Sequence, residues 1–166
     1  MAGESIRRFI DGAWPSLLAL SAALLVLMQW IGPGGAIVDL ELAWSPQRAM
    51  AVLAGFGDPA AARIQVAVDL VFIVTLSMGM MGAIRRVWPP ALLRSAGTAL
   101  VGIYAASDLL ENAGLLLMLG FPVEGMVSRT TTAAAVLKFS ALAAVAAVVA
   151  AGIVVRAGRE RSTGRR

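Results

Sequence analysis

Six polar residues lie within long apolar runs of this sequence, and they are the residues best suited to chemistry: Asp69 in one run, Tyr104, Asp108, Glu111 and Asn112 in the next, and Lys138 in the last. Ionisable side chains inside a membrane-spanning segment are costly and usually mark a path or site for protons, ions or ligands. A carboxyl group that alternates between its protonated and ionised forms beside an ammonium group can couple proton binding to ligand binding. We therefore take these six residues as a candidate binding or proton-relay site.

The composition sets the class of protein. Of 166 residues, 59% are hydrophobic and 14% are charged, whereas a soluble domain has about 45–50% and about 25%. The chain has no cysteine and no histidine, so it lacks a thiol nucleophile, the commonest general base and the commonest transition-metal ligand. We expect no catalytic residue, no cofactor and no metal, although carboxylates alone could still bind a hard cation.

Four segments are long and apolar enough to cross a bilayer, which takes about 20 residues. They cover approximately 14–31, 62–84, 95–119 and 131–155. The sequence therefore predicts one all-α domain over 1–166, an integral membrane four-helix bundle with an external loop at 32–61 and a basic tail at 156–166. We interpret the first segment as a retained helix because no polar cleavage region follows it.

Helix-breaking and capping residues support these limits. Asp58 is a good N-cap, followed by proline in the first turn. Glycine followed by proline is the usual stop signal of a helix. Breaks are expected at Gly32-Pro33-Gly34-Gly35, at Trp88-Pro89-Pro90 and at Gly120-Phe121-Pro122.

The arginines indicate the orientation, because cytoplasmic loops of membrane proteins are enriched in basic residues. Segment ends on one side carry ten arginines: Arg7, Arg8, Arg85, Arg86, Arg94, Arg156, Arg159, Arg161, Arg165 and Arg166. The other side has three, Arg48, Arg63 and Arg129. We expect both termini in the cytoplasm. The net charge of +4 reports this topology, and no nucleic-acid partner is expected.

Within the external loop, Ser45-Pro46 is a good helix start and Gly55 or Gly57 a good stop. The residues between them carry an apolar stripe, which predicts a short helix at the outer interface. It would either cap the mouth of the bundle or offer a surface to lipid or a partner.

Sequence position also predicts depth. At about 1.5 Å per helical residue, Asp69, Glu111 and Lys138 each lie roughly 10 Å below the same surface. Asp108 would lie almost one turn deeper, as a relay. On its own helix it shares one stripe with Tyr104, Glu111 and Asn112. We expect Lys138 to pair with Glu111 or Asp69, and at least one remaining acid to be protonated at neutral pH.

These features favour proton-coupled binding or transport of a small solute, ion or lipid. One alternative is an accessory subunit or structural membrane protein whose polar network only fixes helix packing. An intramembrane lipid-modifying enzyme is less well supported, since no Ser-x-x-Lys pattern or other activated nucleophile is present. Expected partners are membrane lipids and a second copy or a larger membrane complex. The Ala-, Val- and Arg-rich composition suggests the cytoplasmic membrane of a bacterium.

Overall fold

The computed structural model describes residues 2–88 and 91–163, so Pro89, Pro90, Arg165 and Arg166 lie outside it. This part of the chain forms six α-helices: α1 (Ala2–Ile31), α2 (Gly35–Glu41), α3 (Pro46–Ala54), α4 (Pro59–Val87), α5 (Ala91–Gly120) and α6 (Gly125–Thr163). Four of them, α1, α4, α5 and α6, are long and apolar enough to cross a membrane. The expected all-α four-helix membrane fold is confirmed, and the chain is a multi-pass membrane protein.

The long helices extend beyond the predicted spans. The 30 residues of α5 measure about 45 Å, whereas the hydrocarbon core of a bilayer is about 30 Å thick. Helical backbone therefore continues through the headgroup regions at both ends. The basic tail expected at 156–166 is largely the last part of α6.

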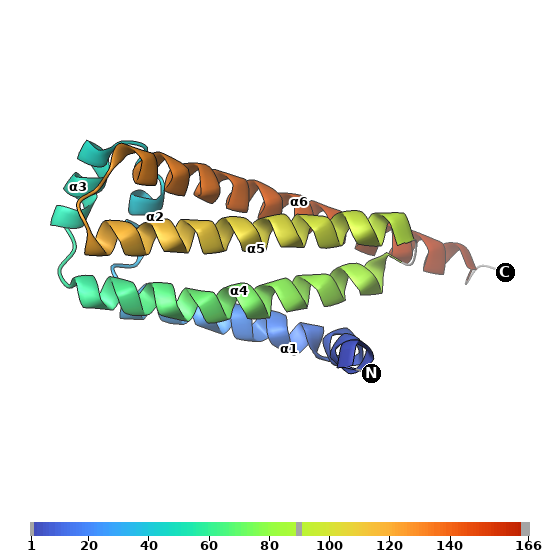
Figure 1. The fold of residues 1–166 in the computed structure, drawn as a ribbon. Coiled ribbons are helices and arrows are strands. Elements are labelled where there is room, and N and C mark those ends of the chain that lie inside the picture. Colours follow the sequence, from blue (N-terminus) through green and yellow to red (C-terminus); the bar gives the residue numbers. More distant parts are fainter. Residues whose placement is uncertain (1, 89–90, 164–166) are drawn as a thin grey trace.

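The four long helices run side by side, with both termini at one end and α2 and α3 at the other (Figure 1). Helices α4, α5 and α6 pack on one another, whereas α1 packs on α4. Over the described residues, α1 and α6 make no extensive contact with each other. The molecule is therefore a three-helix core with a fourth helix on its flank, and the space between α1 and α6 is not closed by helix packing.

Small residues let α1 approach α4 closely. A Cβ atom added to Gly82 would lie 2.4 Å from Cβ of Trp14 and 2.9 Å from the carbonyl oxygen of Ile10. One hydrogen bond also joins the helices, because the Ser21 hydroxyl donates to the Thr75 hydroxyl oxygen over 3.0 Å. Close approach at small residues together with an interhelical hydrogen bond is the usual way in which membrane helices associate.

The stripe predicted for α5 is the side that packs. Its buried residues include Gly97, Val101, Tyr104, Asp108, Glu111, Asn112 and Leu115. Four leucines of the same helix lie outside this stripe and are 44–52% exposed: Leu109, Leu110, Leu116 and Leu117. Gly114 brings α5 against Thr131 of α6.

The predicted helix ends are confirmed. Asp58 caps α4, its carboxylate accepting the backbone N–H of Ala60 at 2.8 Å. Helix α5 ends at Gly120. The guanidinium of Arg63 donates to the carbonyl oxygen of Leu119 over 2.9 Å, which satisfies one of the open carbonyl groups at this terminus.

The segment between α1 and α4 contains two short helices where the sequence predicts one. The expected helix is α3, and the Ser45 hydroxyl accepts the backbone N–H of Arg48 at its start. Ala49 of α3 is fully buried in a cluster with Leu40 and Leu115. Of the two alternatives for this helix, its packing supports a cap on the bundle.

The unexpected helix, α2, follows a sharp turn. Gly34 has a φ of +58°, in the left-handed region that glycine adopts without steric penalty. The turn leads into α2, whose Ile37 and Leu40 pack in a buried cluster with Leu115 of α5. The segment following α2 is also held to α6, because the Ser128 hydroxyl donates to the carbonyl oxygen of Ala43 over 2.6 Å.

The α1–α4 contact leads to a first prediction. Gly82→Leu should lower the free energy of unfolding by about 1–3 kcal/mol, because the new side chain must displace Trp14. The matched control is Gly102→Leu on α5, where an added Cβ meets no atom within 4 Å. Thermal unfolding in detergent measures both variants, and equal effects of the two substitutions would contradict the packing described for α1.

Candidate functional site

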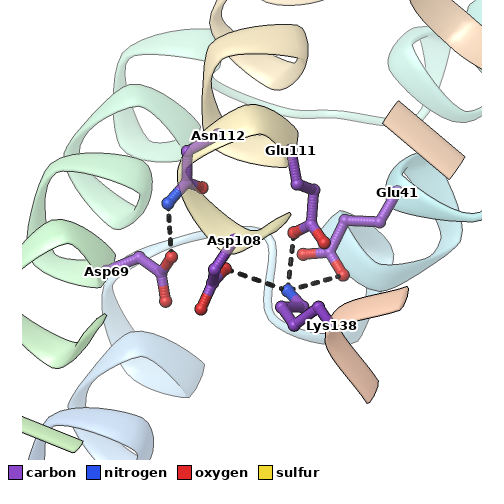
Figure 2. Close-up of polar contacts among 6 residues, drawn as sticks. All are labelled: Glu41, Asp69, Asp108, Glu111, Asn112 and Lys138. Atoms are coloured by element: carbon purple, nitrogen blue, oxygen red, sulfur yellow. Dashed lines mark hydrogen bonds and ion pairs between the residues drawn. The ribbon is translucent and has the colours of Figure 1, made fainter. Parts of the chain in front are cut away.

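The ammonium group of Lys138 is the centre of a buried charge cluster (Figure 2). Its Nζ atom lies 2.6 Å from Oε1 of Glu111, 3.3 Å from Oδ1 of Asp108 and 3.6 Å from Oε2 of Glu41. Asp108 and Glu111 are at most 1% exposed, and Glu41 and Lys138 are 6% and 8% exposed. One ammonium group thus faces three carboxyl groups that are almost completely removed from solvent.

Three helices supply these groups. Asp108 and Glu111 are three residues apart and lie on the same side of α5, and the close approach at Gly114 brings α6 beside them. The pair of Lys138 with Glu111 is one of the two expected pairings. The long side chain of Lys138 also reaches Asp108, a contact that was not expected, and the role of Asp108 as a deeper relay stays a prediction.

Asp69 of α4 is not part of the Lys138 ion pairs. Its carboxylate accepts a hydrogen bond of 2.5 Å from the side-chain amide of Asn112. No basic side chain pairs with Asp69 in the described part of the chain. The carboxyl groups of Asp69 and Asp108 point into the same space (Figure 2). Three of the six predicted residues, Lys138, Asp108 and Glu111, therefore form one set of ion pairs. Asp69 and Asn112 form a hydrogen-bonded pair beside them.

Glu41 is the member of the cluster that the sequence analysis missed. It is the last residue of α2, and burial raises the pKa of its carboxyl group; the nearby Asp108 carboxylate raises it further, while Lys138 and Glu111 act in the opposite direction. A signal existed, since Ile37, Leu40 and Glu41 have the i, i+3, i+4 spacing of one helix face and all three are buried. A seven-residue helix is too short for that spacing to stand out.

A cavity of about 230 Å³ adjoins the cluster. Its polar wall includes Glu41, Gln65, Asp69, Tyr104, Asp108, Asn112 and Lys138. Its apolar wall includes Leu25, Met28, Ile37, Phe72, Phe139 and Leu142. All six predicted site residues except Glu111 therefore line one space, which is bounded by α1, α2, α4, α5 and α6.

Gln65 is a second polar residue that the sequence analysis missed. It is 5% exposed, lies one helical turn before Asp69 on α4 and lines the cavity. Its side-chain oxygen accepts no hydrogen bond from any described residue. The oxygen lies against Gly32, where an added Cβ would be 1.9 Å from it, so Gln65 packs the end of α1 against α4.

The chemistry that this arrangement supports is charge exchange. Three buried carboxyl groups, on Glu41, Asp108 and Glu111, and the half-buried carboxyl group of Asp69 stand against one ammonium group. Charges in hydrocarbon must be paired or neutralised, so protons or a cationic ligand must compensate the excess. Protons and small cations can both supply this compensation.

The central ion pairs lead to a second prediction. Lys138→Met should lower the free energy of unfolding by about 3–5 kcal/mol at pH 8, because it leaves buried carboxylates without their cation. The loss should be smaller at pH 5, since acids that take up protons no longer need the ammonium group. Denaturation in detergent at both pH values measures this.

Arg129→Met is the matched control, because Arg129 is an exposed cation on the same helix. It should change stability by less than about 0.5 kcal/mol. Adding Glu111→Gln to Lys138→Met should restore part of the lost stability. If Lys138→Met lowers the free energy of unfolding equally at pH 8 and pH 5, the ammonium group does not act by balancing ionised carboxyl groups.

The sequence was compared with protein-family models, with curated proteins and with solved structures, and none of them matches. The geometry of the cluster and its cavity is therefore the basis for any functional conclusion.

Proposed function

We propose that this membrane protein binds a small solute, ion or lipid headgroup in the cavity beside Lys138 and exchanges it for protons. The observation that carries the proposal is the excess of buried carboxyl groups over ammonium groups on the wall of a cavity. A purely structural network needs no adjoining space and no surplus of acids.

The surplus itself provides coupling. A charged side chain at the centre of a membrane helix costs about 2.5–3.5 kcal/mol on insertion scales. Protons remove this cost when the cavity holds no cation, and a bound cation removes it when the protons leave. Since both compensate the same charge, each one weakens the binding of the other.

The residues take different parts in this scheme. Asp69 is the acid that a solute reaches first, because it lines the cavity and has no ion pair with the described basic residues. Glu111 and Asp108 share Lys138, and Glu111 is the acid that exchanges a proton. Asn112 orients Asp69, and Tyr104 closes the deep side of the polar wall.

We propose that the cavity opens toward lipid between α1 and α6, which make no extensive contact over the described residues. Movement across the whole membrane would require a path toward the other end. We propose that a second copy of the chain or a larger membrane complex completes such a path. Transport is therefore proposed for the assembled protein, and binding for the single chain.

A structural role is the second candidate, because the 2.6 Å contact between Lys138 and Glu111 directly joins α5 to α6. In that case the network would determine helix register or the docking of a partner subunit. Proton exchange on ligand binding distinguishes the two roles.

We also propose that both termini lie in the cytoplasm and that the membrane is the cytoplasmic membrane of a bacterium. Arg8 lies near the start of α1, Arg86 at the end of α4, Arg94 at the start of α5 and Arg156 in the last part of α6. These helix ends lie together at the end of the bundle that holds the termini (Figure 1), and the positive-inside rule favours a cytoplasmic location for such an end. The cavity then lies nearer the outer leaflet.

The absence of cysteine gives a direct test of orientation. In bacterial cells, Asp39→Cys on the exposed part of α2 should react with a membrane-impermeant maleimide in intact cells. Ala157→Cys at the far end of α6 should react only after permeabilisation. The reverse pattern would overturn the orientation.

Proton exchange is tested on purified protein in weakly buffered detergent containing a pH-sensitive dye. Sodium, choline, ethanolamine, glycerol and phosphate are added in turn. At least one should release protons from the wild-type protein, and Glu111→Gln should abolish that release because the exchangeable carboxyl is gone.

Glu124→Gln is the matched control, since Glu124 is an exposed acid outside the cavity; it should release protons as the wild type does. If none of the five compounds releases protons from the wild-type protein, the structural role is favoured and the proposed exchange is wrong.

A further inference from the structure

We infer that the ligand of this cavity is a primary ammonium compound with a short apolar tail. The inference rests on the proposed function and specifies its substrate class. Charge, hydrogen bonding, shape and size each contribute an independent step.

The charge of the polar wall selects a cation. Four carboxyl groups and one ammonium group surround the cavity or lie directly behind its wall. Asp69 is the accessible acid, because it is half-buried and has no ion pair with a described basic residue. A ligand ammonium at Asp69 would also lie near Asp108, whose carboxyl group points into the same space (Figure 2).

The hydrogen-bonding groups select a cation that carries N–H donors. Asp69 and Asp108 both line the cavity, and their carboxyl groups point into the same space (Figure 2). An ionised carboxylate can only accept hydrogen bonds. A primary ammonium can donate to both side chains, whereas a quaternary ammonium can donate to neither.

The wall beyond these acceptors selects an apolar tail. Phe72 is three residues further along α4, about 4.5 Å beyond Asp69 and away from the α2–α3 end. Leu25 of α1 and Leu142 of α6 complete this part of the lining. A ligand that places its ammonium at Asp69 would therefore direct its tail toward the middle of the membrane, as an amphiphile in that leaflet does.

The volume limits the size of the bound part. The cavity of about 230 Å³ is smaller than the range of about 300–1,000 Å³ found for drug-sized ligands. It suits an amine with a short tail, or the ethanolamine headgroup of a phospholipid whose acyl chains leave through the gap between α1 and α6. Both sources present the same primary ammonium.

Calorimetry on the full chain in phosphatidylcholine nanodiscs tests the inference, because the choline headgroup has no N–H donor. Hexylammonium is the reference probe. Ethylammonium lacks most of the apolar tail of this probe, and hexanol lacks its charge. Hexyltrimethylammonium lacks its N–H donors, and hexanoate carries the opposite charge. Each should bind about 10- to 100-fold more weakly than hexylammonium.

Two variants assign the two halves of the site. Asp69→Asn should weaken hexylammonium and ethylammonium alike by about 10- to 100-fold. Phe72→Ala should weaken the binding of hexylammonium more than that of ethylammonium, so that the two affinities become more similar. Asp39→Asn, the same change at an exposed position of α2, should leave both affinities unchanged. Thermal unfolding of each variant verifies that it is folded before binding is measured.

The lipid content of the nanodisc distinguishes the two sources. Added phosphatidylethanolamine should weaken hexylammonium by competition if the headgroup is the natural ligand, and should have no effect if a free amine is. Equal binding of hexylammonium, hexanol and hexyltrimethylammonium would overturn the inference.

The failure of this inference is separable from the failure of the proposed function. If hexylammonium does not bind but another compound still causes Glu111-dependent proton release, the substrate class is wrong and proton exchange stands. If neither occurs, both are wrong.

Discussion

The structure depends on one buried cation, the ammonium group of Lys138, and on the carboxyl groups that pair with it. The Lys138 ammonium lies within 4 Å of carboxyl oxygens from Glu111, Asp108 and Glu41, and these acids come from two different helices. Without the ammonium, α2 and α5 would each present unpaired acids to a region that excludes water. With it, α2 is held against the bundle and α5 is held in register with α6. The external segment that contains α2 and α3 is thereby fixed in position. Packing at Gly114 and the hydrogen bond from Ser128 reinforce the same arrangement.

The single ammonium group does not balance all four carboxyl groups, and the unpaired carboxyl group of Asp69 lines the cavity, where a ligand can reach it. Asp69 comes from α4, the helix that α1 flanks, and its only described polar partner is the neutral amide of Asn112. Since α1 leans on α4 and leaves α6 uncovered, the space in front of Asp69 is not filled by a helix. The position of α1, packed closely on α4 and not on α6, therefore leaves room for the cavity.

Much of this arrangement could be predicted from the sequence. Hydrophobic length located the four long helices, Asp58 and Gly120 marked helix ends, and the spacing from Tyr104 to Asn112 identified the inward side of α5. Depth counting brought Lys138 and Glu111 together. The contribution of Glu41 could not be predicted in the same way, because it depends on a reversal at Gly34 and on tertiary burial of a helix only seven residues long. The reach of Lys138 to Asp108 was missed because a residue count fixes the position of Cα and not that of a flexible side chain. The role of each residue in the site remains a prediction.

The order of the cluster along the chain has a consequence for biogenesis. The acids precede their cation: Glu41, Asp69, Asp108 and Glu111 are all synthesised before Lys138. When α4 and α5 leave the ribosome, no ammonium group is yet present to balance them. Their carboxyl groups must therefore pass into the lipid phase as neutral acids, or the helical hairpin must wait beside the insertion machinery until α6 follows. In both cases the ion pairs that join α2, α5 and α6 form only after α6 has been made.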